Sequence, residues 1–256
     1  MNRSRWFVNL TPRRRAPRRL FLFPFAGAGP YVFRPWVNLL PGDLSIIAVQ
    51  LPGRGSRIRE TPIRRLDQVL DQLEYEIGEY LDIPFSFFGH SMGALIMFEC
   101  ARRLRASGYE PEQMHVSAYP APHIPFPYRR LHGLSETEFI LEMRYLSGTP
   151  EQVLGCRDLL ELVIPVLRAD FEILEDYRYI EGKPFDCPLL VTGGTRDPIA
   201  RREHLELWRN HAAGPFDLAM FEGNHFYYEQ HREAFLGLVS RNLHGIRLTT
   251  QELTGL

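Results

Sequence analysis

Lysine is nearly absent from this chain, cysteine is rare, and neither sign of charge dominates. Lys183 is the only lysine, so arginine supplies the rest of the basic charge, and the net charge is −1. This balance gives no electrostatic reason to expect a nucleic-acid or membrane partner. The three cysteines, Cys100, Cys156 and Cys187, are odd in number and show no C-x-x-C spacing. They argue against a disulfide framework and a structural zinc site, and they predict a cytoplasmic location.

Long apolar runs are also missing. Arg18 and Arg19 precede the apolar residues 20–23 in the manner of a twin-arginine export signal, but Pro24 and the glycines after it break the run. The run is too short for a signal peptide and far too short to cross a bilayer. We therefore expect a buried first strand behind a basic, frayed N-terminus, and no export.

The length, the composition and the order of apolar patterns predict one α/β domain over residues 1–256. Hydrophobic residues make up 45% of the chain and charged residues 24%, which suits a globular protein with a large core. Apolar runs that predict parallel strands alternate with stretches at helical spacing. Besides the elements described below, strands are expected at 20–23, 46–49, 116–119, 189–192 and 216–221, and helices at 32–40, 66–81, 201–211 and 229–243. A loose tail is expected after Gly245.

This alternation stops between Pro120 and Pro184. Helices are expected inside this segment at 136–145, 152–159 and about 162–177. A connection of this length is far longer than usual between two strands. We predict a helical lid at about 120–184, with a decorated crossover as the alternative.

The pentapeptide Gly-His-Ser-Met-Gly at 89–93 carries the main chemical signal. It follows the apolar run 84–88 and precedes a helical pattern that ends at Gly108. A strand, a tight turn and a helix form the setting of a nucleophile elbow. The serine of an elbow is held in a strained conformation, and the glycines let strand and helix approach closely. The motif therefore predicts Ser91 as a nucleophile.

A serine hydroxyl needs a base beside it, and in proteins with this elbow an acid and then a histidine follow along the chain. Asp197 comes just after the strand at 189–192, and His225 just after the strand at 216–221. Both should therefore lie at the same sheet edge as Ser91. His225 would take the serine proton, and Asp197 would orient the imidazole for acyl transfer.

Other candidates for these two roles fit less well. His90 lies inside the elbow and should point away from the Ser91 hydroxyl. Asp186 precedes its strand, and Asp170 and Asp176 belong to the insertion. His123 and His132 lie in the insertion, and His204, His211 and His231 lie in expected helices and are most simply surface residues.

An oxyanion formed at Ser91 would need two backbone donors. We expect Met92 to supply one amide and Ala26 the other, with Phe25 as the near alternative to Ala26. The alternative for residues 25–29 as a whole is an ordinary βα turn without a catalytic role. That loop lacks the G-x-G-x-x-G spacing and the lysine of a phosphate-binding loop. No H-E-x-x-H or paired Cys/His spacing occurs, so neither a metal nor a cofactor is expected.

Several short segments of the sequence together resemble the type II thioesterases, the stand-alone α/β-hydrolases of polyketide and nonribosomal peptide assembly lines. The Pro-Gly-Arg-Gly turn between a strand and a helix is the most specific of them. The similarity covers nearly the whole chain, through Leu22–Gly27, Phe33–Trp36, Gln50–Gly55, Phe88–Ala94, Gly193–Pro198 and Phe221–Phe226.

The resemblance implies an α/β-hydrolase fold, with a mostly parallel sheet, helices on both faces and a helical lid. It implies the catalytic roles already given to Ser91, Asp197 and His225, and oxyanion amides from Met92 and Ala26. The implied substrate is an acyl thioester on the phosphopantetheine arm of an acyl or peptidyl carrier protein. The implied task is to clear stalled or aberrant acyl groups, and the enzyme is expected to be a monomer.

Two positions depart from the family pattern. Thr195 stands where an extra acidic residue is common, and Asn224 where Gly-Gly-His would have its second glycine. The alternatives are a medium-chain or product-releasing thioesterase, a small-molecule carboxylesterase, and a non-catalytic binding module of the same fold. Carrier proteins are generally acidic, so Arg129, Arg130 and Arg144 near the lid are candidate docking residues.

Overall fold

The computed structural model describes residues 4–12, 14–146 and 148–246. At its centre is a seven-stranded sheet in the order β1-β3-β2-β4-β5-β6-β7. Neighbouring strands run parallel except β1 and β3, which are antiparallel. The strands are β1 Phe7–Asn9, β2 Arg18–Phe23, β3 Leu44–Val49, β4 Phe85–His90, β5 Met114–Ser117, β6 Leu189–Gly194 and β7 Phe216–Phe221.

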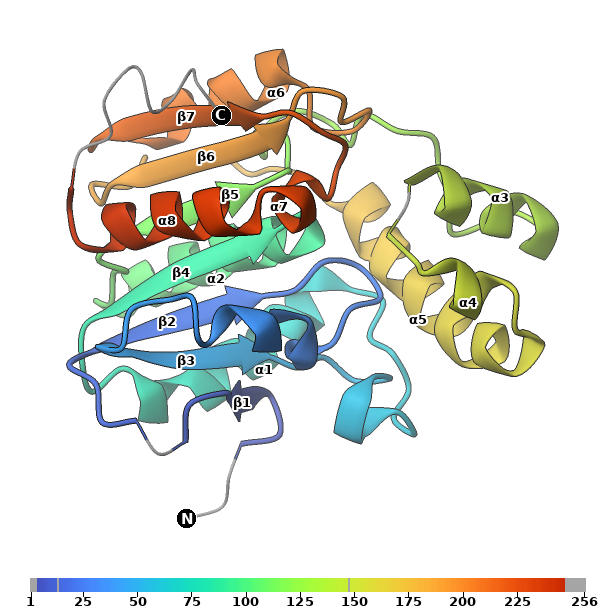
Figure 1. Cartoon of the computed structure of the whole chain (residues 1–256), viewed down its shortest axis with the longest axis horizontal. Coiled ribbons are helices and arrows are strands. Elements are labelled where there is room, and N and C mark those ends of the chain that lie inside the picture. The colour runs from blue at the N-terminus through green and yellow to red at the C-terminus, as the bar shows by residue number, and fades with distance from the viewer. Residues whose placement is uncertain (1–3, 13, 147, 247–256) are drawn as a thin grey trace.

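Helices cover both faces of this sheet. Figure 1 shows α8 (Arg232–Leu243) in front of the strands, with α1 (Leu66–Ile77) and α2 (Met92–Ala106) behind them. Phe21, Phe88 and Val191 are fully buried, as expected for parallel strands covered on both sides. The predicted fold class is therefore confirmed. Within the described residues, no helix has the length and apolar character needed to span a membrane.

Several predicted helices are shorter or tighter than expected. The segment predicted at 32–40 is a 3₁₀ helix at Pro30–Trp36, with a proline inside it. The helix predicted at 201–211 is α6 (Arg202–Glu206) followed by a 3₁₀ turn, Leu207–His211. The closing helix is interrupted at His231, between α7 (Tyr227–Gln230) and α8. Two further 3₁₀ turns lie at Gly55–Arg57 and Gly78–Tyr80.

The expectation of a frayed N-terminus is wrong for residues 6–9. Phe7 pairs with Val49 across β1 and β3, and Trp6 and Phe7 are each only 4% exposed. The Arg57 guanidinium lies 4.4 Å from the centre of the Trp6 ring. This short strand covers the edge of β3, whose backbone groups would otherwise be unpaired. The loose tail predicted after Gly245 lies, from residue 247 onward, outside the described residues.

The insertion between β5 and β6 forms three helices beyond the carboxyl ends of the parallel strands (Figure 1). They are α3 (Glu136–Leu146), α4 (Glu151–Leu154) and α5 (Arg157–Asp176). The break predicted between 159 and 162 is wrong, because the chain turns at Gly155 and α5 continues through Pro165. Val166 and Leu167 are buried immediately after the proline, so tertiary packing holds the helix together despite the missing N–H.

Candidate active site

Ser91 occupies the sharp turn between β4 and α2. Its backbone has φ 54° and ψ −123°, a conformation that is costly for a residue with a side chain. A β-carbon on Gly89 would lie 2.5 Å from the Gly93 carbonyl oxygen, and one on Gly93 would lie 2.0 Å from the Phe23 carbonyl oxygen. The turn thus has the elbow geometry that the motif predicts, and both glycines are required by contact with backbone.

Gly93→Ala should destabilise the fold by about 3 kcal/mol, since a methyl group against backbone cannot be relieved by a change of rotamer. Gly237 in α8 is the matched control, because a β-carbon there meets nothing within 4 Å. Gly237→Ala should be neutral or slightly stabilising, as alanine is the better helix former. Urea unfolding of both variants measures the difference, and equal midpoints would contradict the elbow contact.

Asp197 and His225 meet in a buried pair at the ends of β6 and β7. His225 Nδ1 lies 2.7 Å from Asp197 Oδ2, and both residues are 5% exposed. Asp197 Oδ1 accepts the Ile199 and Ala200 amides at 2.9 and 3.2 Å. Burial opposes ionisation, but the charge and hydrogen bond of His225 and these amides outweigh it and lower the pKa of Asp197. The carboxylate accepts only, so Nδ1 carries the proton and Nε2 keeps its lone pair.

The loops that carry this pair are in direct contact. A β-carbon on Gly194 would lie 2.1 Å from the Asn224 carbonyl oxygen. The Thr195 hydroxyl accepts the Gly223 amide at 3.4 Å, and the Asn224 side chain accepts the Phe226 amide at 2.9 Å. Of the two residues that depart from the family pattern, Thr195 therefore links the histidine loop to the acid loop, and the side chain of Asn224 bonds within the histidine loop.

His90 lies beneath this pair. Its Nδ1 is 2.8 Å from the Ser117 hydroxyl, and its ring centre is 5.1 Å from that of His225. Burial, followed by repulsion from His225 and His115, holds the pKa of His90 well below its ordinary value. His90 is therefore neutral and places no positive charge beside His225.

Ser91, His225 and Ala26 line one small cavity of about 40 Å³, and Phe25 lines it with them. Among the described residues, neither the Ala26 amide nor the Met92 amide has a hydrogen-bond acceptor. The remaining walls are mainly apolar. Helix α3 supplies Met143 and Leu146, α5 supplies Leu167, Phe171 and Leu174, and loops supply Phe126, Ile199 and Phe226. No three His, Cys, Asp or Glu side chains in the described part of the chain gather closely enough to hold a metal ion.

Comparison with known proteins identifies the family. A family model for the thioesterase domain matches residues 18–243. The chain is also 37% identical over 241 residues to the gramicidin S biosynthesis protein GrsT of Aneurinibacillus migulanus, with 94% of each chain covered. The chain belongs to the thioesterase family. It is accordingly an enzyme that hydrolyses thioesters.

Two further relatives place this thioesterase more closely. Thioesterase PikA5 of Streptomyces venezuelae is 34% identical, over 87% of this chain and 79% of its own. The solved structure of the type II thioesterase BorB, from the borrelidin biosynthetic cluster, superposes with a TM-score of 0.87. It is 34% identical and covers 95% of this chain and 99% of its own. The predicted resemblance to type II thioesterases and the α/β-hydrolase fold are both confirmed.

Sequence analysis missed one buried ion pair of the thioesterase. Asp170 of α5 is fully buried and receives two hydrogen bonds from Arg54, at 2.7 and 2.8 Å. A signal was present, because Asp170 interrupts the apolar stripe of α5 that runs from Leu167 to Leu174. A carboxylate in such a stripe requires a partner inside the protein.

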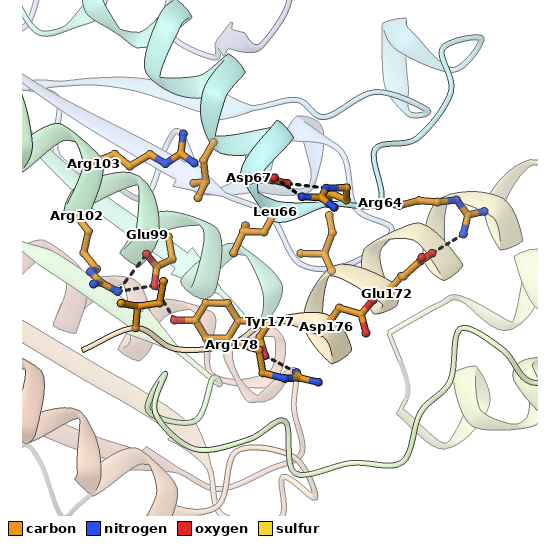
Figure 2. Close-up of a pocket in the computed structure, with 14 residues that line it drawn as sticks. Arg64, Leu66, Asp67, Glu99, Arg102, Arg103, Glu172, Asp176, Tyr177 and Arg178 are labelled. Atoms are coloured by element: carbon orange, nitrogen blue, oxygen red, sulfur yellow. Dashed lines mark hydrogen bonds and ion pairs between the residues drawn. The ribbon is translucent and has the colours of Figure 1, made fainter. Parts of the chain in front are cut away.

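A second concavity of the thioesterase lies between α1, α2 and the end of α5 (Figure 2). It measures about 660 Å³ and shares no lining residue with the cavity at Ser91. Three pairs of its charged side chains bond to one another: Arg64 with Glu172, Arg65 with Asp67 and Arg102 with Glu99. With most of its charges paired, this groove shows no specific sign of a ligand among the described residues.

The arginines considered for carrier docking are each ion-paired within the thioesterase. Arg129 pairs with Glu142, Arg130 with Asp176, and Arg144 with Glu151. They therefore form no patch of uncompensated charge.

Proposed function

We propose that this thioesterase removes acyl groups from the phosphopantetheine arm of acyl or peptidyl carrier proteins. It would thereby clear stalled or aberrant intermediates from a polyketide or nonribosomal peptide synthase. The observation that carries the proposal is the buried Asp197–His225 pair, whose histidine shares one cavity with the elbow serine, Ser91. The names of GrsT and BorB, which refer to gramicidin S and borrelidin biosynthesis, support the substrate class.

The proposed mechanism is a two-step acyl transfer. Ser91 Oγ attacks the thioester carbonyl while His225 takes its proton, and Asp197 stabilises the imidazolium. The tetrahedral intermediate collapses, the C–S bond breaks, and the pantetheine thiol leaves with the proton from His225. Water then attacks the acyl-serine with His225 as base, which releases the acid and restores the Ser91 hydroxyl.

The amides of Ala26 and Met92 are proposed to bind the oxyanion in both steps. Both lack an acceptor among the described residues. The neighbouring Gly27 amide is unsuitable, because it already donates to Asp170 at 2.7 Å. Loss of one oxyanion donor typically slows a reaction on the order of 10²–10³-fold, so the geometry of this loop is decisive.

Residues 120–184 are proposed to act as a lid on a single domain. Met143 and Leu146 of α3 and Phe171 of α5 form walls of the cavity at Ser91. A cavity of about 40 Å³ holds little more than water, so an acyl chain requires these helices to separate. We further propose a cytoplasmic monomer, and the free thiols of all three cysteines suit a reducing compartment.

A substrate panel tests the function. The same acyl group is presented as a carrier-bound thioester, as a coenzyme A thioester and as an oxygen ester, and kcat/KM is measured for each. We expect the carrier-bound form to be hydrolysed fastest. Faster turnover of coenzyme A thioesters with longer chains would favour a medium-chain thioesterase, and faster turnover of the oxygen ester would favour a carboxylesterase.

A further inference from the structure

The insertion reaches the oxyanion loop through one buried carboxylate. Asp170, on α5, is fully buried and accepts the Gly27 backbone amide at 2.7 Å. Arg54 binds the same carboxylate through both terminal nitrogens, at 2.7 and 2.8 Å. Arg54 is itself 5% exposed, so both charged side chains are shielded from water, while Gly27 is half-buried.

The packing around this carboxylate is equally close. Gly27 has φ +79°, and a β-carbon on it would lie 2.5 Å from the end of the Leu167 side chain. Gly53, with φ +83°, would bring a β-carbon to 3.1 Å from Val166. The second half of α5 therefore lies directly on two loops, one that carries Ala26 and one that carries Arg54.

Stability alone does not account for this arrangement. A buried ion pair is often no more stabilising than well-packed apolar side chains of the same volume, because both charges lose their hydration. What a bidentate pair with a third hydrogen bond does supply is orientation. The Gly27 N–H belongs to the peptide group that begins at the Ala26 carbonyl. Fixing that peptide plane limits the rotation of the preceding plane, which carries the Ala26 N–H and is joined to it at the Ala26 Cα.

We infer that Asp170 is a positioning residue for the oxyanion loop. It holds the Gly27 amide from helix α5, and Arg54 fixes the carboxylate, so the Ala26 amide keeps its direction only while this half of α5 is seated. The inference rests on the proposed function in so far as that function assigns the oxyanion to Ala26.

The test compares Asp170→Asn with Glu175→Gln as a matched control. Glu175 is also a buried carboxylate of α5, but it binds the Leu131 and His132 amides rather than the oxyanion loop. The main readout is the inhibition constant of an alkyl trifluoromethyl ketone, which forms a tetrahedral adduct with an active serine. It is measured as protection of Ser91 from labelling by a fluorophosphonate, so no carrier substrate is needed.

Asp170→Asn should weaken the ketone on the order of 10–100-fold. It should lower kcat for a small acyl thioester by a similar factor, with KM changed by less than about threefold. Glu175→Gln should leave both values within about threefold of the wild type. Arg54→Lys keeps the charge but not the two-point contact, so it should give an intermediate loss, and it replaces Asp170→Asn if that variant does not fold.

Equal losses in Asp170→Asn and Glu175→Gln would overturn the inference, since both would then merely anchor α5. Unchanged ketone binding in folded Asp170→Asn or Arg54→Lys would also overturn it. The proposed function fails separately, if wild-type enzyme reacts with the fluorophosphonate at Ser91 but does not hydrolyse carrier-bound thioesters.

Discussion

Ser91→Ala should lower kcat for thioester hydrolysis by on the order of 10⁴-fold or more. The alanine has no oxygen to attack the carbonyl, and neither the proposed base, His225, nor the proposed oxyanion amides can replace it. Substrate binding should persist, because the apolar walls of the cavity are unchanged. The loss should therefore appear in kcat rather than in KM.

The measurement follows release of the free carrier thiol by mass spectrometry, with a propionylated carrier protein as substrate. Ser240→Ala is the matched control, since the hydroxyl of this serine donates to the Leu236 carbonyl of its own helix α8. It should retain wild-type turnover. Undiminished hydrolysis by folded Ser91→Ala would refute the nucleophile assignment and, with it, the proposed acyl-enzyme.

Asp197→Asn should lower kcat by roughly 10⁴-fold, and the hydrogen bonds around Asp197 explain why. The Ile199 and Ala200 amides both donate to Oδ1, so the oxygen of an asparagine would face them. Its NH₂ group would then face His225 Nδ1. That nitrogen would become an acceptor, the ring proton would move to Nε2, and the histidine could no longer take a proton from Ser91.

Asp186→Asn is the control for this substitution. Asp186 lies before β6, its side chain is 64% exposed, and its ion pair with Lys183 is long, at 3.8 Å. We expect no change in kcat. A folded Asp197→Asn enzyme with wild-type turnover would show that His225 works without the carboxylate, contrary to the proposed triad.

The lowered pKa of Asp197 also predicts a pH dependence of stability. A carboxyl whose pKa is lowered in the folded state stabilises the protein at pH values above its pKa in the unfolded chain, which is about 4. This contribution is lost as the pH falls through the pKa of the folded state. The wild type should therefore lose more thermal stability than Asp197→Asn on acidification below about pH 4. Melting temperatures measured from pH 7 to pH 3 test this difference.

The candidate site could be predicted from the sequence because its signals are local. Ser91 sits in a motif whose flanking strand and helix are both recognisable, and Asp197 and His225 each directly follow an apolar strand. Parallel strands bring their carboxyl ends to one edge, so the order of elements was enough to expect these residues at one place. The structure unites His225 and Asp197 in a hydrogen bond.

The features that escaped prediction depend on partners distant in the chain. The strand at Phe7–Asn9 is too short to show a pattern, and it forms because β3 offers an edge. The role of Asp170 depends on Arg54, 116 residues away. The residues next to Asp170 and Arg54 in the sequence give no indication that these two side chains pair.

Pro165 divides helix α5 into two halves that differ in how tightly they pack. The proline has no N–H, so the Glu161 carbonyl lacks its usual partner four residues ahead. Leu159 and Leu162, before it, are 41% and 52% exposed, whereas Val166 and Leu167, after it, are 5% and 4% exposed. We expect the lid to open by movement of the first half of α5, which is loosely packed. The second half, which packs on the oxyanion loop, should stay in place. Entry of a large acyl substrate would then leave the alignment of the reacting groups unchanged.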